Sequence, residues 1–429
     1  MPALSFLDIP RELRDFIYGD YLTIDGGYHF NFKTGKLEPA KPGQQPLNLA
    51  LTCSLIAAEI RGLALNHNVI SFSTVGGCRV SAFRFERMTQ YINRHRAQMR
   101  RLNLDMDPAI VELVDYQKPW AIASLVELDR MADVLSSTLK EECCVTWPKV
   151  WTAYEVRPYD GWDFYHLERD DRSKYKYSAA AAAIFFFEAN PGLHCHIRRI
   201  VLDEDCESVN HPSRHAKGLI CFTEANPRLR IEQRLGLWTN GFLDTDKTYS
   251  PYDRFDIASS DERHTWGLGW PTSGLSPSVY DWIRYALKLP SNFSMVFDGS
   301  PSPDLAAEIF RDFLVGDVVL QVARERCWQQ GLMPEPNSYY RNRAPFIGEG
   351  YPEAITAIAS GTSSISCNFE VSRFGDLEVE EVIRKYRDSS YEEWSKLWWR
   401  HSKSKYVPTS PLPSWVDLLR QGTIIDGEE

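Results

Sequence analysis

Two ten-residue segments of this chain, 36 residues apart, are nearly identical. Ile184–Leu193 (IFFFEANPGL) aligns with Ile220–Leu229 (ICFTEANPRL), and seven of the ten positions match. Each segment predicts a helix that ends at Asn-Pro, because proline disfavours helical geometry in the residue before it. A strand is expected after each stop, and the alignment places Arg198 and Arg234 in register.

A second pair of segments extends this pattern. Met99–Asp105 (MRRLNLD) resembles Ile197–Asp203 (IRRIVLD), and both predict strands in which alternate apolar residues share a face. A helix is expected over residues 82–98, before the first of them. Helix–strand units stack with strands inside and helices outside, as in leucine-rich solenoids. The unequal spacing favours an irregular, leucine-rich-repeat-like array. In the alternative interpretation the segments resemble each other by coincidence, because they solve similar packing problems.

The first 75 residues predict a helix, a loop, a helix and a strand. Pro10 suits the first turn of a helix, and Asp8 suits the positive end of its dipole. A polar loop is expected over residues 34–46. Apolar residues form one face of the first helix, and in the second helix they recur in steps of four and three residues. In the strand, two apolar residues point to the same side. These positions are Ile9, Leu13, Phe16 and Ile17, then Leu49, Cys53, Ile56, Ile60 and Leu63, then Ile70 and Phe72.

This N-terminal segment resembles the start of fungal F-box-like proteins. Their pattern is a leucine–proline–glutamate helix start, a "TC" helix carrying a glutamate, and an "N-x-F-x-F" strand. The matching positions are Ile9, Pro10, Glu12, Leu13, Ile17, Tyr18, Leu51, Thr52, Cys53, Ile56, Glu59, Asn68, Ile70 and Phe72. The chain departs from the pattern at Ser54, where arginine is usual, and at Leu65-Asn66, where leucine–tyrosine is usual.

The resemblance implies that the first helices dock on a Skp1-type adaptor of a ubiquitin ligase. The residues it marks as candidates for partner binding are Ile9, Pro10, Leu13, Phe16, Ile17, Leu51, Ile56 and Ile60. In the alternative interpretation the two helices only cap the hydrophobic body behind them, since an apolar stripe is more often core than interface. The chain would then be a self-contained scaffold.

The remainder predicts a mixed α+β fold with C-terminal helices. We expect three regions: the F-box-like module at 1–75, the helix–strand body at 76–300, and a C-terminal helical region at 301–429 that packs on the body. Helices are predicted at Tyr280–Leu287 and Asp304–Phe313, whereas Ser276-Pro277-Ser278 suggests a turn. Near the end, two helices carry stripes that favour core packing, and Ser390 and Glu393 form a capping box. Those stripes are Val379, Val382, Ile383 and Tyr386, then Tyr391, Trp394, Leu397 and Trp398.

The stretch from His194 to Cys221 is the one candidate for metal chemistry. It holds four histidines and three cysteines, and His211 and His215 have a spacing seen in zinc sites. Cys195 and Cys206 could complete four ligands, but they lie too far apart in the chain for the usual pattern. We therefore favour unrelated polar residues, expect no metal and no cofactor, and keep a metal-dependent enzyme as an outside alternative.

Other features point away from catalysis. The sequence holds none of the usual nucleophile, phosphate-loop or zinc-protease motifs, and the adjacent pair Cys143-Cys144 does not match a redox motif. The net charge of −10 disfavours nucleic acid, and the arginine-rich run 84–101 is typical of a solvated helix face. Nine scattered cysteines, no secretory signal and no long apolar run predict a cytoplasmic or nuclear protein without membrane contact. We expect a non-enzymatic protein that binds other proteins.

Overall fold

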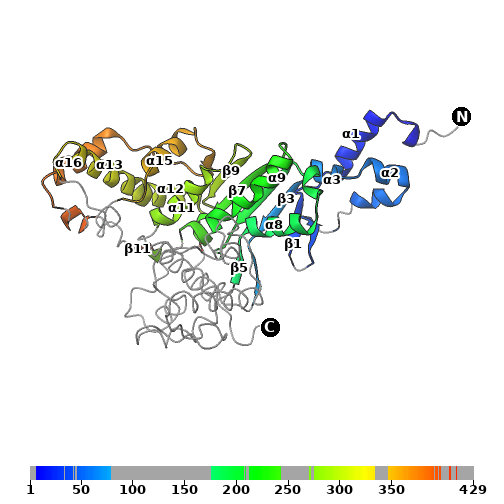
Figure 1. Ribbon diagram of the computed structural model, residues 1–429, viewed down its shortest axis with the longest axis horizontal. Helices are drawn as coiled ribbons and strands as arrows, with labels where there is room; N and C mark the ends of the chain where they lie inside the picture. Colours follow the sequence, from blue (N-terminus) through cyan, green and yellow to red (C-terminus); the bar gives the residue numbers. More distant parts are fainter. Residues whose placement is uncertain are drawn as a thin grey trace, which may run out of the picture.

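The fold centres on one seven-stranded sheet in a computed structural model (Figure 1). The structure describes residues 6–78, 175–242, 270–333, 346–397, 405–406 and 412, apart from 33, 42, 44, 45, 207, 209–211, 272–274, 391 and 395. The strands run from edge to edge in the order β2 (Lys36–Pro39), β1 (Tyr28–Asn31), β3 (Val69–Ser73), β6 (Arg199–Glu204), β7 (Arg230–Gly236), β9 (Phe293–Asp298) and β10 (Ile365–Cys367).

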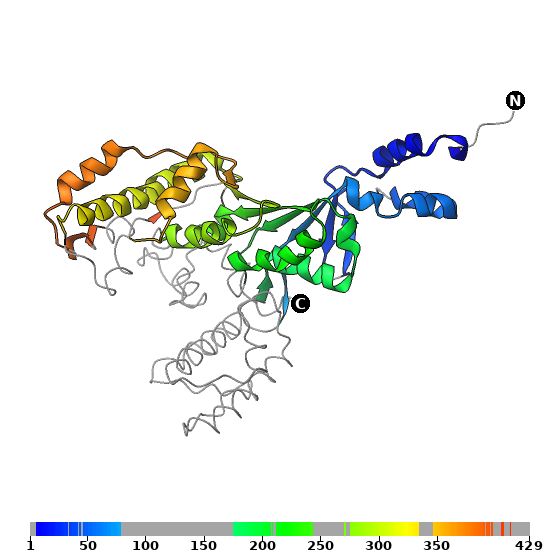
Figure 2. The same ribbon diagram turned by 45° about the horizontal axis from the view of Figure 1, so that its top comes forward.

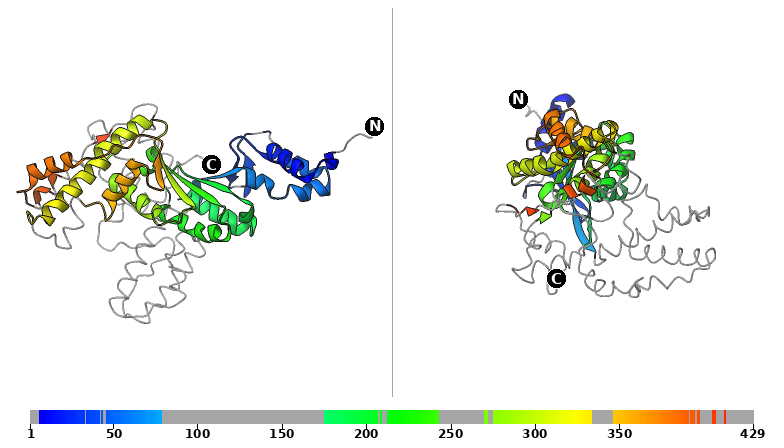
Figure 3. Two further views of the ribbon diagram at one scale, coloured as in Figure 1. Left: turned by 90° about the horizontal axis from the view of Figure 1, so that it is seen from above. Right: turned by 90° about the vertical axis from the view of Figure 1, so that its left-hand side faces the viewer.

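From β1 to β10 every pair of neighbouring strands is parallel, and each new strand is added on the same side. Right-handed crossovers that always advance in one direction place their helices on one face of a sheet. Helices α8 (Ala179–Ala189), α9 (Ile220–Ala225) and α11 (Leu275–Ala286) indeed lie along one side of the strands (Figure 3). The prediction of a mixed helix–strand fold is confirmed at this level.

The two faces of the sheet differ in chemistry. Alternate strand residues point toward the helices and are buried; these include Ile70, Phe72, Ile200, Leu202, Ile231, Leu235, Met295 and Phe297. Most of the intervening residues on the other face are polar or charged, although Val69, Val201 and Val296 are among them. Asp203 is the strand partner of Arg234, and Arg234 forms an ion pair of 2.6 Å with Glu232. The described sheet is thus mainly apolar under its helices, where Glu204 and Gln233 are the buried exceptions on β6 and β7, and it carries charges on the opposite face.

The near-identical segments fold as predicted, with one difference. Both helices end at the asparagine before proline, since Asn190 and Asn226 are the C-terminal caps of α8 and α9. The strands that follow are neighbours, but Arg199 pairs with Arg230, and Arg234 pairs with Asp203. The 36-residue offset that aligns Arg198 with Arg234 in the sequence does not carry over to the strand pairing. The first unit contains a 3₁₀ turn, η3 (Leu193–His196), between its helix and its strand, and the second unit has no counterpart to this turn.

The N-terminal module contains more elements than predicted. Helix α1 (Arg11–Leu22) follows a turn, η1 (Phe6–Asp8), and leads into the β1–β2 hairpin, which was not predicted. The predicted loop over residues 34–46 is wrong in part, because β2 lies inside it. The predicted second helix is three short ones: η2 (Pro46–Leu51), α2 (Ser54–Glu59) and α3 (Leu63–His67). Gly62 separates the last two with a φ of 79°, a conformation that glycine tolerates well. The predicted stripe still shares one small core, although the backbone breaks twice.

Strands of this module belong to the main sheet, since β3 pairs with β6. The sheet therefore continues across residue 75, and β10 carries it past residue 300. Two small sheets complete the described strands: β4 (Val75–Cys78) with β5 (Tyr175–Tyr177), and β8 (Trp270–Pro271) with β11 (Lys405–Tyr406). The predicted segments at 82–105 and Cys143-Cys144 lie outside the described residues.

Helices gather at the opposite end of the molecule from α1 and α2 (Figure 2). They are α12 (Pro303–Ile309), a π-helical turn η7 (Phe310–Val315), α13 (Gly316–Gln329), α15 (Tyr351–Ser360) and α16 (Asp376–Tyr386). Both helices predicted between 280 and 313 are present. Ser276-Pro277-Ser278 is not a turn but the start of α11, where the missing N–H of proline costs nothing.

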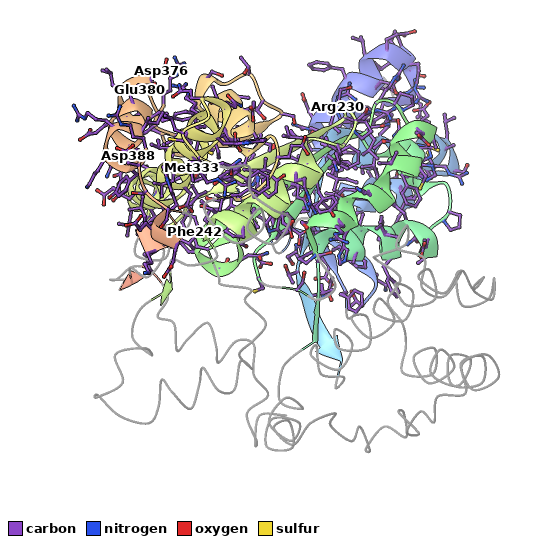
Figure 4. All side chains as sticks on the ribbon, turned by 60° about the vertical axis from the view of Figure 1, so that its left-hand side comes forward. Arg230, Phe242, Met333, Asp376, Glu380 and Asp388 are labelled. Atoms are coloured by element: carbon purple, nitrogen blue, oxygen red, sulfur yellow. The ribbon has the colours of Figure 1, made fainter. Side chains whose placement is uncertain are left out.

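The predicted C-terminal stripe packs against α13. Val379 and Ile383 are buried with Trp394, and Val382 and Tyr386 pack at the edge of the same cluster. The capping box is also confirmed: the Glu393 carboxylate accepts from the Ser390 N–H at 2.7 Å, and Ser390 Oγ accepts from the Glu393 N–H at 3.3 Å. On the outer side of α16, Asp376 and Glu380 lie close together (Figure 4), and both form ion pairs with Arg326.

Candidate partner-binding surface

One buried carboxylate holds the N-terminal module together. Glu59, the last residue of α2, accepts hydrogen bonds from Nε and Nη2 of the Arg14 guanidinium and from the Tyr18 hydroxyl at 2.7 Å. Arg11 adds an ion pair at 3.0 Å. Arg14 also donates to the carbonyls of Leu7 and Ile9, which fixes the turn before α1. These contacts lower the pKa of Glu59 to about 2, with the bond from Arg14 as the largest cause.

The network decides which face of α1 is buried. Arg14, Tyr18 and Leu22 are spaced by four residues and face α2. The apolar stripe lies on the other side of the helix, where Phe16 is 71%, Leu13 57% and Ile17 42% exposed. Tyr21 extends the stripe by one further turn and is half exposed. The exposed face of α1 thus carries four large apolar side chains, with the exposed Asp20 among them.

Most of the exposed large apolar side chains among the described residues belong to this module. Besides the α1 stripe they include Leu7, Leu51 and Leu55. Isolated exposed apolar side chains are ordinary, but a run of them on one helix marks an interaction site or an aggregation hazard. We call Leu13, Phe16, Ile17 and Tyr21 the α1 stripe below.

The structure divides the predicted partner-binding residues into three groups. Pro10, Leu13, Phe16, Ile17 and Leu51 are exposed, Ile9 is half-buried, and Ile56 and Ile60 are buried. The two buried isoleucines pack with Tyr18 and Leu22 in the core of the module. Their role is to support the α1 stripe rather than to extend it. Tyr21 and Leu55 were not predicted, although Tyr21 lies four residues after Ile17 and so continues the same helical face.

The His/Cys-rich stretch does not form a metal site in the part of the chain that the structure describes. No group of three or more histidine, cysteine, aspartate or glutamate side chains there is arranged to hold an ion, and His211 lies outside the described residues. His215 is buried, and its Nδ1 lies 2.6 Å from Ser178 Oγ. Cys221 Sγ bonds the carbonyl of Gly218. The candidate ligands therefore serve separate local contacts.

A second polar cluster lies under the sheet beside His215. Glu204, fully buried at the end of β6, accepts from the N–H groups of Ala179 and Ala180 at the start of α8 and from Gln233. Ser178 caps the same helix by accepting from the Ala181 N–H. Burial raises the pKa of Glu204 to about 7 despite these bonds. The cluster is sealed from solvent and joins α8 to the sheet, so its geometry suits capping rather than catalysis.

Comparisons of the chain with protein-family models, with curated proteins and with solved structures found no match. Among the described residues no helix is long and apolar enough to cross a membrane. The arguments for function therefore rest on the surface and contacts described above.

Proposed function

We propose that this chain is a non-enzymatic protein–protein interaction protein whose N-terminal module docks on a Skp1-type adaptor. The observation that carries the proposal is the α1 stripe. Four large apolar side chains stay exposed on one helix, while the opposite face is held by the Glu59 network. An amphipathic helix with its apolar face outward suits a groove or helix pair on a partner.

The Glu59 network supports this assignment in a second way. A helix whose apolar face is exposed would gain by turning that face inward. Arg14 and Tyr18 oppose this rotation, because it would leave the Glu59 carboxylate without its partners. The module therefore presents the α1 stripe in a fixed orientation, which reduces the entropy lost on binding.

For the body we propose a leucine-rich-repeat-like role in target recognition. Its support is the one-directional order of the parallel strands, with α8, α9 and α11 on one face. The polar face that carries Asp203, Glu232 and Arg234 is the surface assigned to a target. In this arrangement the adaptor and the target bind different parts of the chain.

The test is co-expression of the full chain with a Skp1-type adaptor, followed by size-exclusion chromatography and calorimetry. We expect a one-to-one complex that Leu13→Asp plus Ile17→Asp weakens at least about tenfold, since both changes put a charge in the contact. Leu332→Asp plus Leu377→Asp is the matched control, because both leucines are exposed at the other end of the molecule. Thermal denaturation should show that both double variants fold.

Two results would contradict the proposal. If the wild-type chain does not bind the adaptor, the chain is better described as a self-contained scaffold. If the stripe variant and the control variant bind the adaptor equally well, the stripe does not form the contact. Where the wild type binds the adaptor, Arg234→Glu should bind it with the same affinity, because Arg234 lies on the polar face of the sheet.

A further inference from the structure

Four positively charged side chains converge on one tyrosine ring. The charged groups of Arg214, Lys217, Arg284 and Lys288 lie 4.9, 4.7, 4.9 and 5.8 Å from the centroid of the Tyr285 ring. Arg214 and Lys217 come from a 3₁₀ segment, η4 (Pro212–Leu219), which packs against α11. Arg284 and Tyr285 lie in the last turn of α11, and Lys288 follows two residues after the end of that helix.

Ordinary structural roles account for only part of this cluster. Arg284 and Lys288 suit the negative end of the α11 dipole, and long basic side chains often cover an aromatic ring with their stems. Neither reason explains why η4 contributes two more cations. One ring has only two faces to offer to cations, so it cannot stabilise four of them equally.

The cluster has little negative charge to balance it. Among the described residues, the one ion pair within it joins Arg284 to Asp281 at 3.4 Å. The Nε atoms of Arg214 and Arg284 are shielded from solvent and have no hydrogen-bond partner in the described structure. Such a concentration of positive charge is also unusual in a chain whose net charge is −10. An anion at the exposed side of the cluster would supply the missing negative charge.

The geometry favours one class of anion. A carboxylate carries a single charge and is satisfied by one guanidinium. A phosphate monoester carries close to two charges at neutral pH and offers three acceptor oxygens, which matches two guanidinium groups and two ammonium groups around one ring. Lys217 and Lys288 are exposed, and Arg214 and Arg284 are half-buried, so a ligand can reach the cluster from solvent.

We propose that Arg214, Lys217, Arg284 and Lys288, gathered around Tyr285, form a binding site for a phosphate monoester. The site lies on η4 and α11, apart from the α1 stripe, and it does not depend on adaptor docking. The phosphate can belong to a phosphorylated side chain of another protein or to a small phosphorylated compound, since both offer the same three oxygens.

The test uses the full chain and two probes. The first is a fluorescent peptide with one phosphoserine among uncharged residues, together with its unphosphorylated counterpart, followed by fluorescence anisotropy. The second is inorganic pyrophosphate, followed by calorimetry and by competition with the peptide. We expect saturable binding that requires the phosphate and weakens as salt is raised.

Arg214→Gln plus Lys217→Gln should weaken binding at least about tenfold, because both changes remove charge and donors from the site. The matched control is Arg384→Gln plus Lys385→Gln. It removes the same charge from two exposed residues on α16, where Lys385 lies over the Tyr386 ring, and it should bind as the wild type does. Far-ultraviolet circular dichroism and thermal denaturation show whether each variant folds, and Lys288→Gln alone provides a milder change at an exposed position.

The two probes separate the sources of the phosphate. Tighter binding of the phosphopeptide indicates a protein segment, tighter binding of pyrophosphate indicates a small compound, and either result supports the site. Two results would overturn it: neither probe binds saturably to the wild type, or the two double variants lose the same affinity, which would reduce the effect to bulk charge.

Discussion

Arg14 and Glu59, 45 residues apart in the chain, meet in a two-pronged ion pair between α1 and α2. The Tyr18 hydroxyl donates to the same carboxylate. The hydrogen bonds from Arg14 and Tyr18 together fix how the two helices cross. This contact turns the face of α1 that carries Arg14, Tyr18 and Leu22 inward. It thereby leaves the α1 stripe on the surface, where the proposed adaptor would bind.

Glu59→Gln should destabilise the N-terminal module. The amide cannot accept from both arms of Arg14, and its NH₂ group would face the guanidinium. We expect a lower urea midpoint and faster proteolysis within residues 6–60. Glu380→Gln removes a carboxylate from an exposed pair with Arg326, which should cost at most about 1 kcal/mol. Equal midpoints for the two variants would contradict the role given to Glu59.

The same pair predicts a loss of stability in acid. The pKa of Glu59 is about 2 in the folded chain, against an ordinary value of 4.5. The folded state therefore stabilises the ionised form of Glu59 more than the unfolded state does. This contribution to the free energy of unfolding is complete above the ordinary pKa of 4.5 and is lost as the pH falls toward 2. The difference in urea midpoint between the wild type and Glu59→Gln should shrink from pH 6 to pH 3. A constant difference would exclude this origin.

Glu204 predicts a pH dependence of the opposite sign. Its folded pKa is about 7, so the folded state keeps the proton over a range in which the unfolded state has lost it. The stability from this site is complete below about pH 4.5 and falls by about 3 kcal/mol as the pH rises to about 7. Urea denaturation at several pH values should show this slope in the wild type and not in Glu204→Gln. The same slope in both proteins would assign it to another group.

The two asparagines of the near-identical segments should differ in their contribution to stability. The Asn226 amide donates to the carbonyls of His194 and Ile197 at 2.8 Å and so joins two helix–strand units. Asn190 donates to Phe186 within its own helix. Asn226→Ala should cost about 1–3 kcal/mol, because it leaves buried carbonyls without a donor. Asn190→Ala should cost less in the same urea denaturation, and a larger loss there would contradict the bridging role.

Trp394 should be the most sensitive position of the C-terminal helices. It is fully buried with Val379 and Ile383, and its ring centroid lies 5.8 Å from that of Tyr386. Trp394→Ala should cost about 3–5 kcal/mol, as expected for loss of a large core side chain. Leu377→Ala, at an 87% exposed position on α16, should cost less than about 0.5 kcal/mol. Similar urea midpoints would show that α16 and Trp394 do not pack as one unit.

Patterns within short stretches were enough to predict many elements. Asn-Pro marked the ends of α8 and α9, alternation marked Ile70 and Phe72 in β3, and spacing marked Val379 and Ile383 in α16. The β1–β2 hairpin was missed because its strands are only four residues long and β2 lies within the polar stretch predicted as a loop. In the second predicted helix the stripe was right and the continuity was wrong, since apolar spacing does not reveal a residue such as Gly62 with positive φ.

Sequence alone determined where many of the described helices and strands form, because caps, prolines and apolar periodicity act within a few residues. Tertiary structure decided which surfaces they show. The burial of Arg14 on α1 depends on a carboxylate from α2, and the pairing of Arg199 with Arg230 depends on the length of η3. The cations around Tyr285 meet only because η4 packs on α11. Each of these contacts joins residues distant in the chain, so no local pattern records them.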